Sequence, residues 1–450
     1  MQKTKSIVIL IATTLITSSF CCPQWIAIYG GKGDDRAYSI QQTSNGGYIV
    51  AGTTESFGKK NHDLWILKLN PNGAIAWQKT YGGNGYDQAR SIQQTSDGGY
   101  IVAGTTESFC KKNHDLWILK LKGDGTVVWQ KSYGGQYKDD ARFIHQTADH
   151  GYVVTGNTWS FSKGKSDVWV LKLKFDGSID WQKSYGGNGY DKACSIYQTS
   201  DGGYVITGIT KSFGAQDHDF WVLKLRSNGT IIWQKAFGGF HTDYGRSIQQ
   251  TRDMSYVVAG WTRSFGGGDY DGWVLKLNPD GNIVWQKTYG GSGSDHANFI
   301  QQTDDGGYIV TGWTDSFGKK NLDLWIFKLN PNGKIVWQKT YGGNDIDYAE
   351  SVMQTSDGGY IIAGGTMSFG FTRKAGFNSW VLKLDANGEI HDCDVMGISE
   401  VFVSDTSVTA KNTNAIPQDT FSKPIDTSVI PQVIETEISL LCRSPLQPES

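Results

Sequence analysis

Cysteine, proline and long apolar runs are all scarce in this chain of 450 residues. Six cysteines are too few for disulfides to build a fold of this length, and nine prolines leave room for many uninterrupted strands. No segment after the N-terminus is apolar for long enough to cross a bilayer. The 42 basic and 44 acidic residues are mixed along the chain, so the sequence offers no basic face for nucleic acid or an anionic membrane. Helical repeats are excluded because no run has helical periodicity.

The first 19 residues have the character of a secretory signal peptide. MQKTK is basic, SIVILIATTLI is a short apolar run, and small residues follow it. We therefore expect export, to a secreted, periplasmic or cell-surface location. A lipoprotein would need Cys21 or Cys22 as its lipidated residue, and Phe20 before Cys21 disfavours that alternative.

A tryptophan returns every 52 residues along the chain. In the first complete unit, strand-like runs cover residues 36–43, 47–54, 63–70 and 74–81, and turns rich in Gly, Asn and Asp separate them. Four antiparallel strands repeated seven times predict an all-β fold, a seven-bladed β-propeller of four-stranded blades over residues 24–396. The tryptophans at this interval are Trp25, Trp77, Trp129, Trp181, Trp233, Trp285 and Trp337.

Large flat side chains suit the wedge that widens outward between neighbouring blades. We therefore expect the repeated tryptophans to be structural, together with a second set on the third strand of each unit. The second set is Trp65, Trp117, Trp169, Trp221, Trp273, Trp325 and Trp380.

The seventh unit is incomplete, and its missing piece stands at the other end of the chain. After VLKLDANGEI the unit runs into His391 and Asp392, whereas WIAIYGG stands alone at residues 25–31. We expect this N-terminal strand to complete the last blade and close the ring, so that no sheet edge stays open.

Two further expectations concern the ends of the chain. Cys21, Cys22, Cys393 and Cys442 flank the repeats, so we expect Cys21, Cys22 or Cys442 to lie close enough to Cys393 for a disulfide. Residues 397–450 are rich in Ser, Thr, Pro and Val, which indicates a low-complexity tail or stalk, extended or disordered.

The turn before the repeated tryptophan is similar to the tryptophan-docking repeat of quinoprotein propellers, with Gly73 four residues before Trp77. The alanine and aspartate that precede this glycine in the family are Leu67 and Leu69 here, so the resemblance implies the blade and not the cofactor. The units WQKTYGG and QTSDGGYIVAG resemble a group of secreted bacterial and archaeal repeat proteins without a settled activity. This second resemblance covers residues 24–392 and implies a secreted propeller.

Positions that are the same in every copy are expected to serve the blade itself. Such positions include Gln42, Thr54, Ser56 and Lys68, the last of which should extend its ammonium toward the end of the blade. A seven-fold aspartate could form a ring for a cation, but we favour a role in which each carboxylate caps its own loop. The aspartates of this set are Asp35, Asp87, Asp139, Asp191, Asp243, Asp295 and Asp347.

The longer loops belong at the end of the disc opposite the tight hairpins, and binding residues belong on such loops. The three tryptophans outside the repeat fall there, and exposed aromatics among polar groups suit a sugar or peptide. The alternative is that these tryptophans extend the packing between blades. The candidate ligand-binding residues are Trp159, Trp261, Trp313, Lys211, Arg263, Asp315, Tyr244 and His296.

Signals for catalysis are weak. The eight histidines form no metal motif, and no phosphate-binding glycine loop or nucleophile elbow is recognisable. We expect a monomeric, exported, non-catalytic propeller without a cofactor, which binds a glycan, a peptide or a protein of the cell envelope. The alternatives are an extracytoplasmic enzyme, quinoprotein-like or hydrolytic, that uses the same face, and a purely structural surface protein.

Overall fold

The structure of the protein is a computed structural model. It describes residues 24–59, 61–110, 113–213, 217–319, 321–370 and 376–390, and seven short segments after them. Those segments are residues 396–397, 402–405, 411–412, 418–419, 425–426, 432–433 and 437–443.

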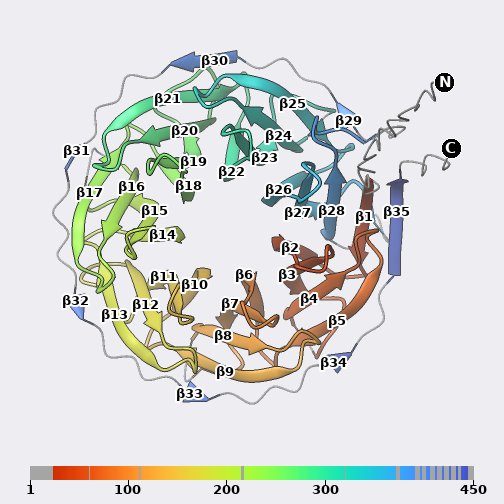
Figure 1. Ribbon diagram of the computed structural model, residues 1–450, viewed down its shortest axis with the longest axis horizontal. Helices are drawn as coiled ribbons and strands as arrows, with labels where there is room; N and C mark the ends of the chain where they lie inside the picture. Colours follow the sequence, from red (N-terminus) through yellow and green to blue (C-terminus); the bar gives the residue numbers. More distant parts are fainter. Residues whose placement is uncertain are drawn as a thin grey trace, which may run out of the picture.

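Seven blades of four antiparallel strands form a closed ring, as the sequence predicts (Figure 1). The described residues contain strands, turns and bends but no helix. The innermost strands, which surround the axis, are β2 (Asp35–Gln42), β6 (Asp87–Gln94), β10 (Asp139–Gln146), β14 (Asp191–Gln198), β18 (Asp243–Gln250), β22 (Asp295–Gln302) and β26 (Asp347–Gln354). The second strands are β3 (Tyr48–Thr54), β7 (Tyr100–Thr106), β11 (Tyr152–Thr158), β15 (Tyr204–Thr210), β19 (Tyr256–Thr262), β23 (Tyr308–Thr314) and β27 (Tyr360–Thr366).

The outer half of each blade holds two further strands. The third strands are β4 (Asp63–Leu69), β8 (Asp115–Leu121), β12 (Asp167–Leu173), β16 (Asp219–Leu225), β20 (Asp271–Leu277), β24 (Asp323–Leu329) and β28 (Asn378–Leu384). The fourth strands are β5 (Ile75–Tyr81), β9 (Val127–Tyr133), β13 (Ile179–Tyr185), β17 (Ile231–Phe237), β21 (Ile283–Gly290) and β25 (Ile335–Tyr341), and β1 (Trp25–Gly30) takes this place in the seventh blade. β1 pairs antiparallel with β28, which confirms that the N-terminal strand closes the ring.

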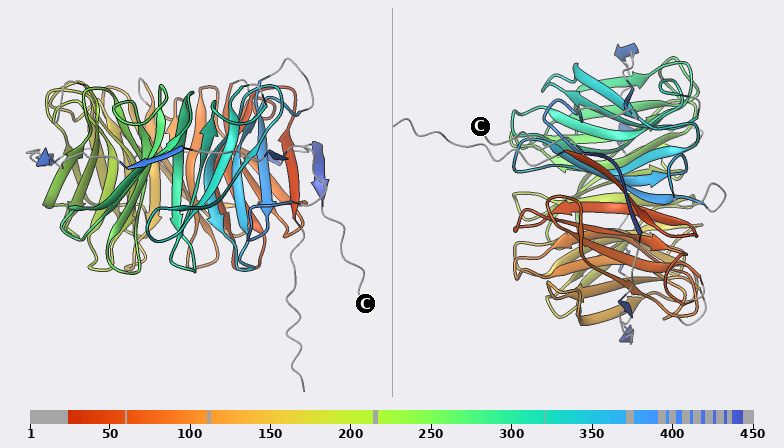
Figure 2. Two further views of the ribbon diagram at one scale, coloured as in Figure 1. Left: turned by 90° about the horizontal axis from the view of Figure 1, so that it is seen from above. Right: turned by 90° about the vertical axis from the view of Figure 1, so that its right-hand side faces the viewer.

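The C-terminal segment adds a fifth, short strand outside every blade (Figures 1 and 2). The sequence predicts an extended or disordered tail or stalk, whereas each segment that the structure describes there is a strand paired to the ring. These strands are β29 (Met396–Gly397), β30 (Phe402–Asp405), β31 (Lys411–Asn412), β32 (Gln418–Asp419), β33 (Ile425–Asp426), β34 (Gln432–Val433) and β35 (Glu437–Arg443).

The predicted disulfide stays a prediction. Cys21, Cys22 and Cys393 lie outside the described residues, and Cys442 lies in β35 opposite Ile26. Cys194 is a free thiol.

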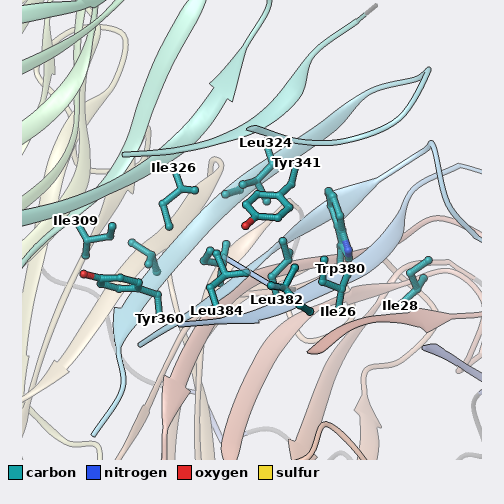
Figure 3. Packing of buried hydrophobic residues seen from close by; sticks show 14 residues of the cluster. Ile26, Ile28, Ile309, Leu324, Ile326, Tyr341, Tyr360, Trp380, Leu382 and Leu384 are labelled. Carbon is teal, nitrogen blue, oxygen red and sulfur yellow. The ribbon is translucent and has the colours of Figure 1, made fainter. Parts of the chain in front are cut away.

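The core is divided into seven clusters, each of which lies between two neighbouring blades. Figure 3 shows the cluster between the sixth and seventh blades, where Ile326 and Tyr341 face Trp380, Leu382 and Leu384. Alternate residues of each strand enter the cluster on either side of the blade, because successive side chains point to opposite faces of a sheet. Apolar side chains therefore fill the space between neighbouring blades.

The repeated tryptophans lie half-buried on the fourth strands, whereas the tryptophans of the third strands are fully buried. The expectation that both sets pack between blades is confirmed, but the burial differs because the fourth strand lies nearer to the outside of the ring. Trp25 is the exception among the fourth-strand set: it is fully buried, and β35 covers β1 along its whole length.

Each repeated tryptophan docks on the turn between the third and fourth strands of the next blade. The indole N–H of Trp77 donates to the carbonyl of Gly123 at 3.1 Å, and its ring lies against Gly125. Gly125 has a φ of 79°, and a Cβ atom there would lie 3.0 Å from the indole ring. Only glycine satisfies both constraints. The corresponding glycine–tryptophan contacts recur in all seven blades, as Gly73–Trp25, Gly177–Trp129, Gly229–Trp181, Gly281–Trp233, Gly333–Trp285 and Gly388–Trp337.

Conserved glutamines within the repeat form a hydrogen-bonded ring around the axis. The side-chain carbonyl of Gln94 accepts a bond of 2.9 Å from the backbone N–H of Ser44 in the preceding blade. The same bond occurs at all seven blade junctions, at 2.8–2.9 Å, and Gln42 closes the circle by accepting from Ser356. The invariance of this glutamine therefore reflects the joining of blades.

The seven-fold aspartates cap their own loops, as favoured from the sequence. Asp35 accepts a bond of 2.8 Å from the backbone N–H of Gly31 and bonds of 2.5 Å from the hydroxyls of Thr54 and Ser56. The bond from the glycine four residues earlier is present at all seven copies. These bonds explain why the threonine and serine do not vary.

The lysine of the third strand reaches the hairpin between the first two strands. The ammonium of Lys120 lies 2.9 Å from Asp97, and five further blades have an equivalent pair. In the first blade Asn45 replaces the aspartate, and burial lowers the pKa of Lys68 to about 8. Partial burial opposes ionisation of Asp97, but bonds from Thr95 and Lys120 outweigh it and hold its pKa at about 2. The lysine thus fastens one end of the blade.

The difference in burial predicts an order of stability effects. Trp117→Ala should lower the free energy of unfolding by about 3–5 kcal/mol, since the side chain is fully buried. Trp129→Ala should lower it by roughly 1–3 kcal/mol, because its ring is half-exposed. Urea unfolding followed by circular dichroism measures both. A loss for Trp129→Ala as large as that for Trp117→Ala would contradict this account.

Candidate functional site

The longer loops gather at one end of the ring, as predicted. Innermost strands begin and second strands end there, and the loop backbones bond to each other, as in the bond of 2.9 Å from Glu55 N–H to the carbonyl of Asp34. We call this end the loop face; it holds residues 55–62 and 82–86 and their equivalents. The opposite end, the hairpin face, holds residues 43–47 and 70–74 and their equivalents.

Four rings stack in sequence on the loop face of the fifth and sixth blades. Tyr244 and Trp261 lie 5.1 Å apart with an interplanar angle of 16°, and Trp261 and His296 lie 4.8 Å apart at 26°. His296 and Trp313 are closest, at 3.8 Å and 25°. We call these four residues the aromatic stack.

The strand register produces the aromatic stack. Tyr244 on β18 stands opposite Trp261 on β19, and His296 on β22 stands opposite Trp313 on β23. The contact between Trp261 and His296 crosses from the fifth blade to the sixth. Both tryptophans remain half-exposed, so they join the blades and also present surface to solvent.

His296 contributes a neutral ring to the aromatic stack. Burial, and then the nearby Arg246 guanidinium, lower the pKa of His296 well below its usual range. A protonated imidazole there would carry its charge into a partly buried stack. The ring can therefore act as a flat surface at neutral pH.

Trp159 lies apart from the aromatic stack. It follows β11 in the third blade and is half-exposed, and Lys138 and Lys192 lie 5.7 Å and 5.8 Å from its ring centre. The position equivalent to Trp261 in the third blade is Asn157, whose side chain donates to Asp140 at 2.8 Å. Among the described residues, no ring contact joins Trp159 to Trp261 or Trp313.

The three charged candidates occupy one loop position in three consecutive blades, and all three are exposed. The Lys211 ammonium lies 3.5 Å from Asp217. The Arg263 guanidinium lies 5.7 Å from the ring centre of Tyr270, which itself contacts Trp261 edge-on at 5.0 Å. Arg263 therefore borders the aromatic stack, while the backbone of Asp315 is bonded to Ser294 in the preceding loop.

A ring of charged side chains inside the channel was missed by sequence reasoning. The fourth residue of every innermost strand lines one small cavity of about 90 Å³. Comparing this position among the copies would have revealed it, since its occupants range from arginine to glutamate. Its occupants are Tyr38, Arg90, Arg142, Cys194, Arg246, Asn298 and Glu350.

A larger polar cavity opens on the loop face of the first three blades. It has a volume of about 570 Å³ and is lined by His62, Tyr86, His114, Arg90 and Arg142, among others. His114 is 2.8 Å from Glu107, and the His62 and Tyr86 rings are 4.9 Å apart. Since both arginines also line the small cavity, this loop cavity adjoins the channel.

The described residues contain no group of three His, Cys, Asp or Glu side chains arranged to hold a metal ion. They also contain no helix long and apolar enough to pass through a membrane. What the face presents is flat aromatic surface, several hydrogen-bonding groups and a cluster of guanidinium groups. Such a surface can bind a ligand by stacking, hydrogen bonds and charge.

Comparisons with known proteins give the fold alone. No family model matches the chain, and no curated protein matches it. Among solved structures, Sqt1 from Chaetomium thermophilum is similar with 10% identity over 86% of this chain and 98% of that chain, at a TM-score of 0.44. A DUF4221 family member from Bacteroides vulgatus has 10% identity over 85% of this chain and 97% of that chain, at a TM-score of 0.34. Likenesses this weak decide nothing about function.

The environment of His296 gives a testable titration. Because its pKa is lowered, we expect nitrogen NMR to find a neutral imidazole at pH 6. As the pH falls through about 6.5, the unfolded chain takes up a proton that folded His296 does not, so this residue's contribution to stability falls. His296→Phe, which keeps a ring but cannot titrate, should reduce the slope of stability with pH between about 7 and 5. A charged imidazole at pH 6 would show that the stack does not shield it.

Proposed function

We propose that this protein is an exported, non-catalytic propeller that binds carbohydrate on its loop face. The observation that carries the proposal is the aromatic stack, whose two tryptophans are half-buried on the loop face, with the polar loop cavity across the channel on the first three blades. Export is proposed from the N-terminal signal-like residues 1–19. The resemblance to secreted repeat proteins agrees with that location.

Carbohydrate fits this surface better than the other candidate ligands. A sugar ring offers an apolar C–H face to an indole and hydroxyl groups around its edge. Trp313, which ends the aromatic stack and stacks on His296 alone, supplies the first kind of surface, while His62, His114 and Glu107 in the loop cavity supply donors and acceptors. A peptide or an envelope protein remains an outcome that the binding experiment distinguishes.

Catalysis is not needed to explain these residues. The carboxylates of the seven-fold set are held in loop-capping bonds, and the imidazole of His296 is stacked on both faces. Glu350, which lies in the channel, is paired with Arg246 at 3.0 Å. Release of reducing ends from a bound oligosaccharide would favour the enzyme alternative instead.

The proposal predicts that Trp313→Ala weakens oligosaccharide binding by at least about tenfold, because it removes the exposed stacking surface. A glycan array, run with and without calcium, would select the oligosaccharide, and calorimetry would measure its affinity. The fold should survive, since the side chain is only half-buried.

Phe240→Ala is the matched control for this experiment. Phe240 is 77% exposed on the loop face of the fifth blade, outside the aromatic stack. Its replacement should leave the affinity unchanged. Equal binding by wild type and Trp313→Ala, or an array without any positive glycan, would overturn the proposed function.

A further inference from the structure

Three arginines face one another inside the channel with too few carboxylates to balance them. Arg246 is paired with Glu350 at 3.0 Å, and Arg142 lies 3.5 Å from Asp140. Arg90 lies over the ring of Tyr38, 4.3 Å from its centre. In the part of the chain that the structure describes, no carboxylate pairs with Arg90. We call Arg90, Arg142 and Arg246 the arginine cluster.

The arginine cluster is continuous with both halves of the proposed binding surface. Arg90 and Arg142 line the loop cavity as well as the channel cavity. On the other side, Tyr244 of the aromatic stack stands two residues before Arg246 on β18. A ligand on the face would therefore lie beside these guanidinium groups.

We propose that the carbohydrate bound by this face is anionic, and that its carboxylate or sulfate group is held by the arginine cluster. This inference rests on the proposed function and specifies its substrate class. Guanidinium groups form paired, charge-assisted hydrogen bonds to planar or tetrahedral oxyanions. A single anion between the arginines would also offset the mutual repulsion that remains, since Glu350 pairs with Arg246 and Asp140 with Arg142 but three guanidinium groups face these two carboxylates.

The test compares three probes by calorimetry at low salt. They are a uronic-acid oligosaccharide, the same oligosaccharide with its carboxylates reduced to alcohols, and a sulfated neutral oligosaccharide. We expect wild-type protein to bind at least one anionic probe about tenfold or more tightly than the reduced probe. The double variant Arg90→Gln, Arg142→Gln should lose this preference, while Arg252→Gln, an exposed arginine paired with Asp304 on the hairpin face, should keep it.

Each outcome separates the two proposals. Equal affinity of wild type for the acidic and reduced probes would overturn the anionic assignment and leave carbohydrate binding intact. Anion binding that survives Trp313→Ala would support the arginine cluster and contradict the aromatic platform. Tighter binding of the sulfated or of the uronic probe identifies the anion. The affinities of wild-type protein for the acidic and reduced probes test the anionic assignment even if the double variant does not fold.

A second, independent observation concerns the C-terminal segment, whose sequence repeats with a period of seven residues. Asp or Asn followed by Thr recurs at residues 405–406, 412–413, 419–420 and 426–427. Proline recurs with the same period, at Pro417, Pro424 and Pro431. A low-complexity tail of biased composition has no reason to keep such a period.

The pairing of this segment with the ring has the same period. One residue in every seven of the segment stands opposite one residue in every 52 of the ring. The pairs are Gly397–Thr340, Ser404–Thr288, Lys411–Ala236, Gln418–Ser184, Ile425–Ser132, Gln432–Thr80 and Ser439–Ile28.

We infer that each seven-residue unit of the sequence matches one blade, so that the described strands β29 to β35 together act as a clasp on the ring. The register sets Asp405, Asp419 and Asp426 opposite lysines of the fourth strands, where opposite charges favour pairing. The occupied edges are the ones through which propellers would otherwise pair with each other.

Two rearrangements of the full chain test the clasp. In one, residues 411–417 and 418–424 exchange places, which keeps both the period and the composition. In the other, the same 14 residues are scrambled so that the period is lost. Hydrogen exchange of the outer strands β13 and β17, followed by mass spectrometry, should be as slow as in wild type for the exchange variant and at least about tenfold faster for the scrambled one.

The chain that ends at residue 396 gives the unprotected reference. The inference falls if the scrambled variant protects β13 and β17 as well as wild type does, because the period would then have no role. It also falls if these strands exchange as fast in wild type as in the shortened chain.

Discussion

The ring depends on the contact between a tryptophan of one blade and a glycine turn of the next. Neighbouring blades share no strand ladder, and backbone bonds such as that of 2.8 Å from Asp87 N–H to the carbonyl of His62 join them only at the loop face, so side chains make the rest of each junction. The indole of Trp77 meets this need with a bond to Gly123 and with packing on Gly125, which must be glycine because of its left-handed backbone and the ring above it. Each turn holds the preceding tryptophan, and the contact is kept even in the seventh blade, where Gly388 stands 51 residues after Trp337 whereas Gly125 stands 48 after Trp77.

This constraint determines where the chain can differ between blades. At the hairpin face, repeat residues form the glutamine ring and the lysine–aspartate pairs. In the loops, repeat residues hydrogen-bond to the capping aspartates. The ends of the innermost and second strands at the loop face have no such task. The aromatic stack and the arginine cluster both occupy those strand positions, so the surface that can serve function is the one that the architecture leaves unassigned.

The sequence predicts the fold, its closure and the capping aspartates, because each depends on a pattern that repeats or on a piece that is missing. It does not predict that Trp129 is half-exposed while Trp117 is buried, since burial depends on the distance from the axis. The arginine cluster was missed because its members lie 52 to 156 residues apart and meet only when the ring closes. Trp159 stands near the end of a second strand, as Trp261 does, but the residue equivalent to Trp261 is Asn157, two residues before Trp159.

The electrostatics of the channel connect the two halves of the loop face. Arg246 favours a neutral His296, and a neutral imidazole can stack on both Trp261 and Trp313 without bringing another positive charge toward the arginine cluster. The same guanidinium groups are kept apart by the ring itself, because their Cα atoms belong to different innermost strands that the glutamines join. The framework thus holds like charges at a fixed separation beside a flat neutral surface. Only a ligand that carries both a negative charge and an apolar face can offset the repulsion between the guanidinium groups and also stack on the neutral aromatic surface.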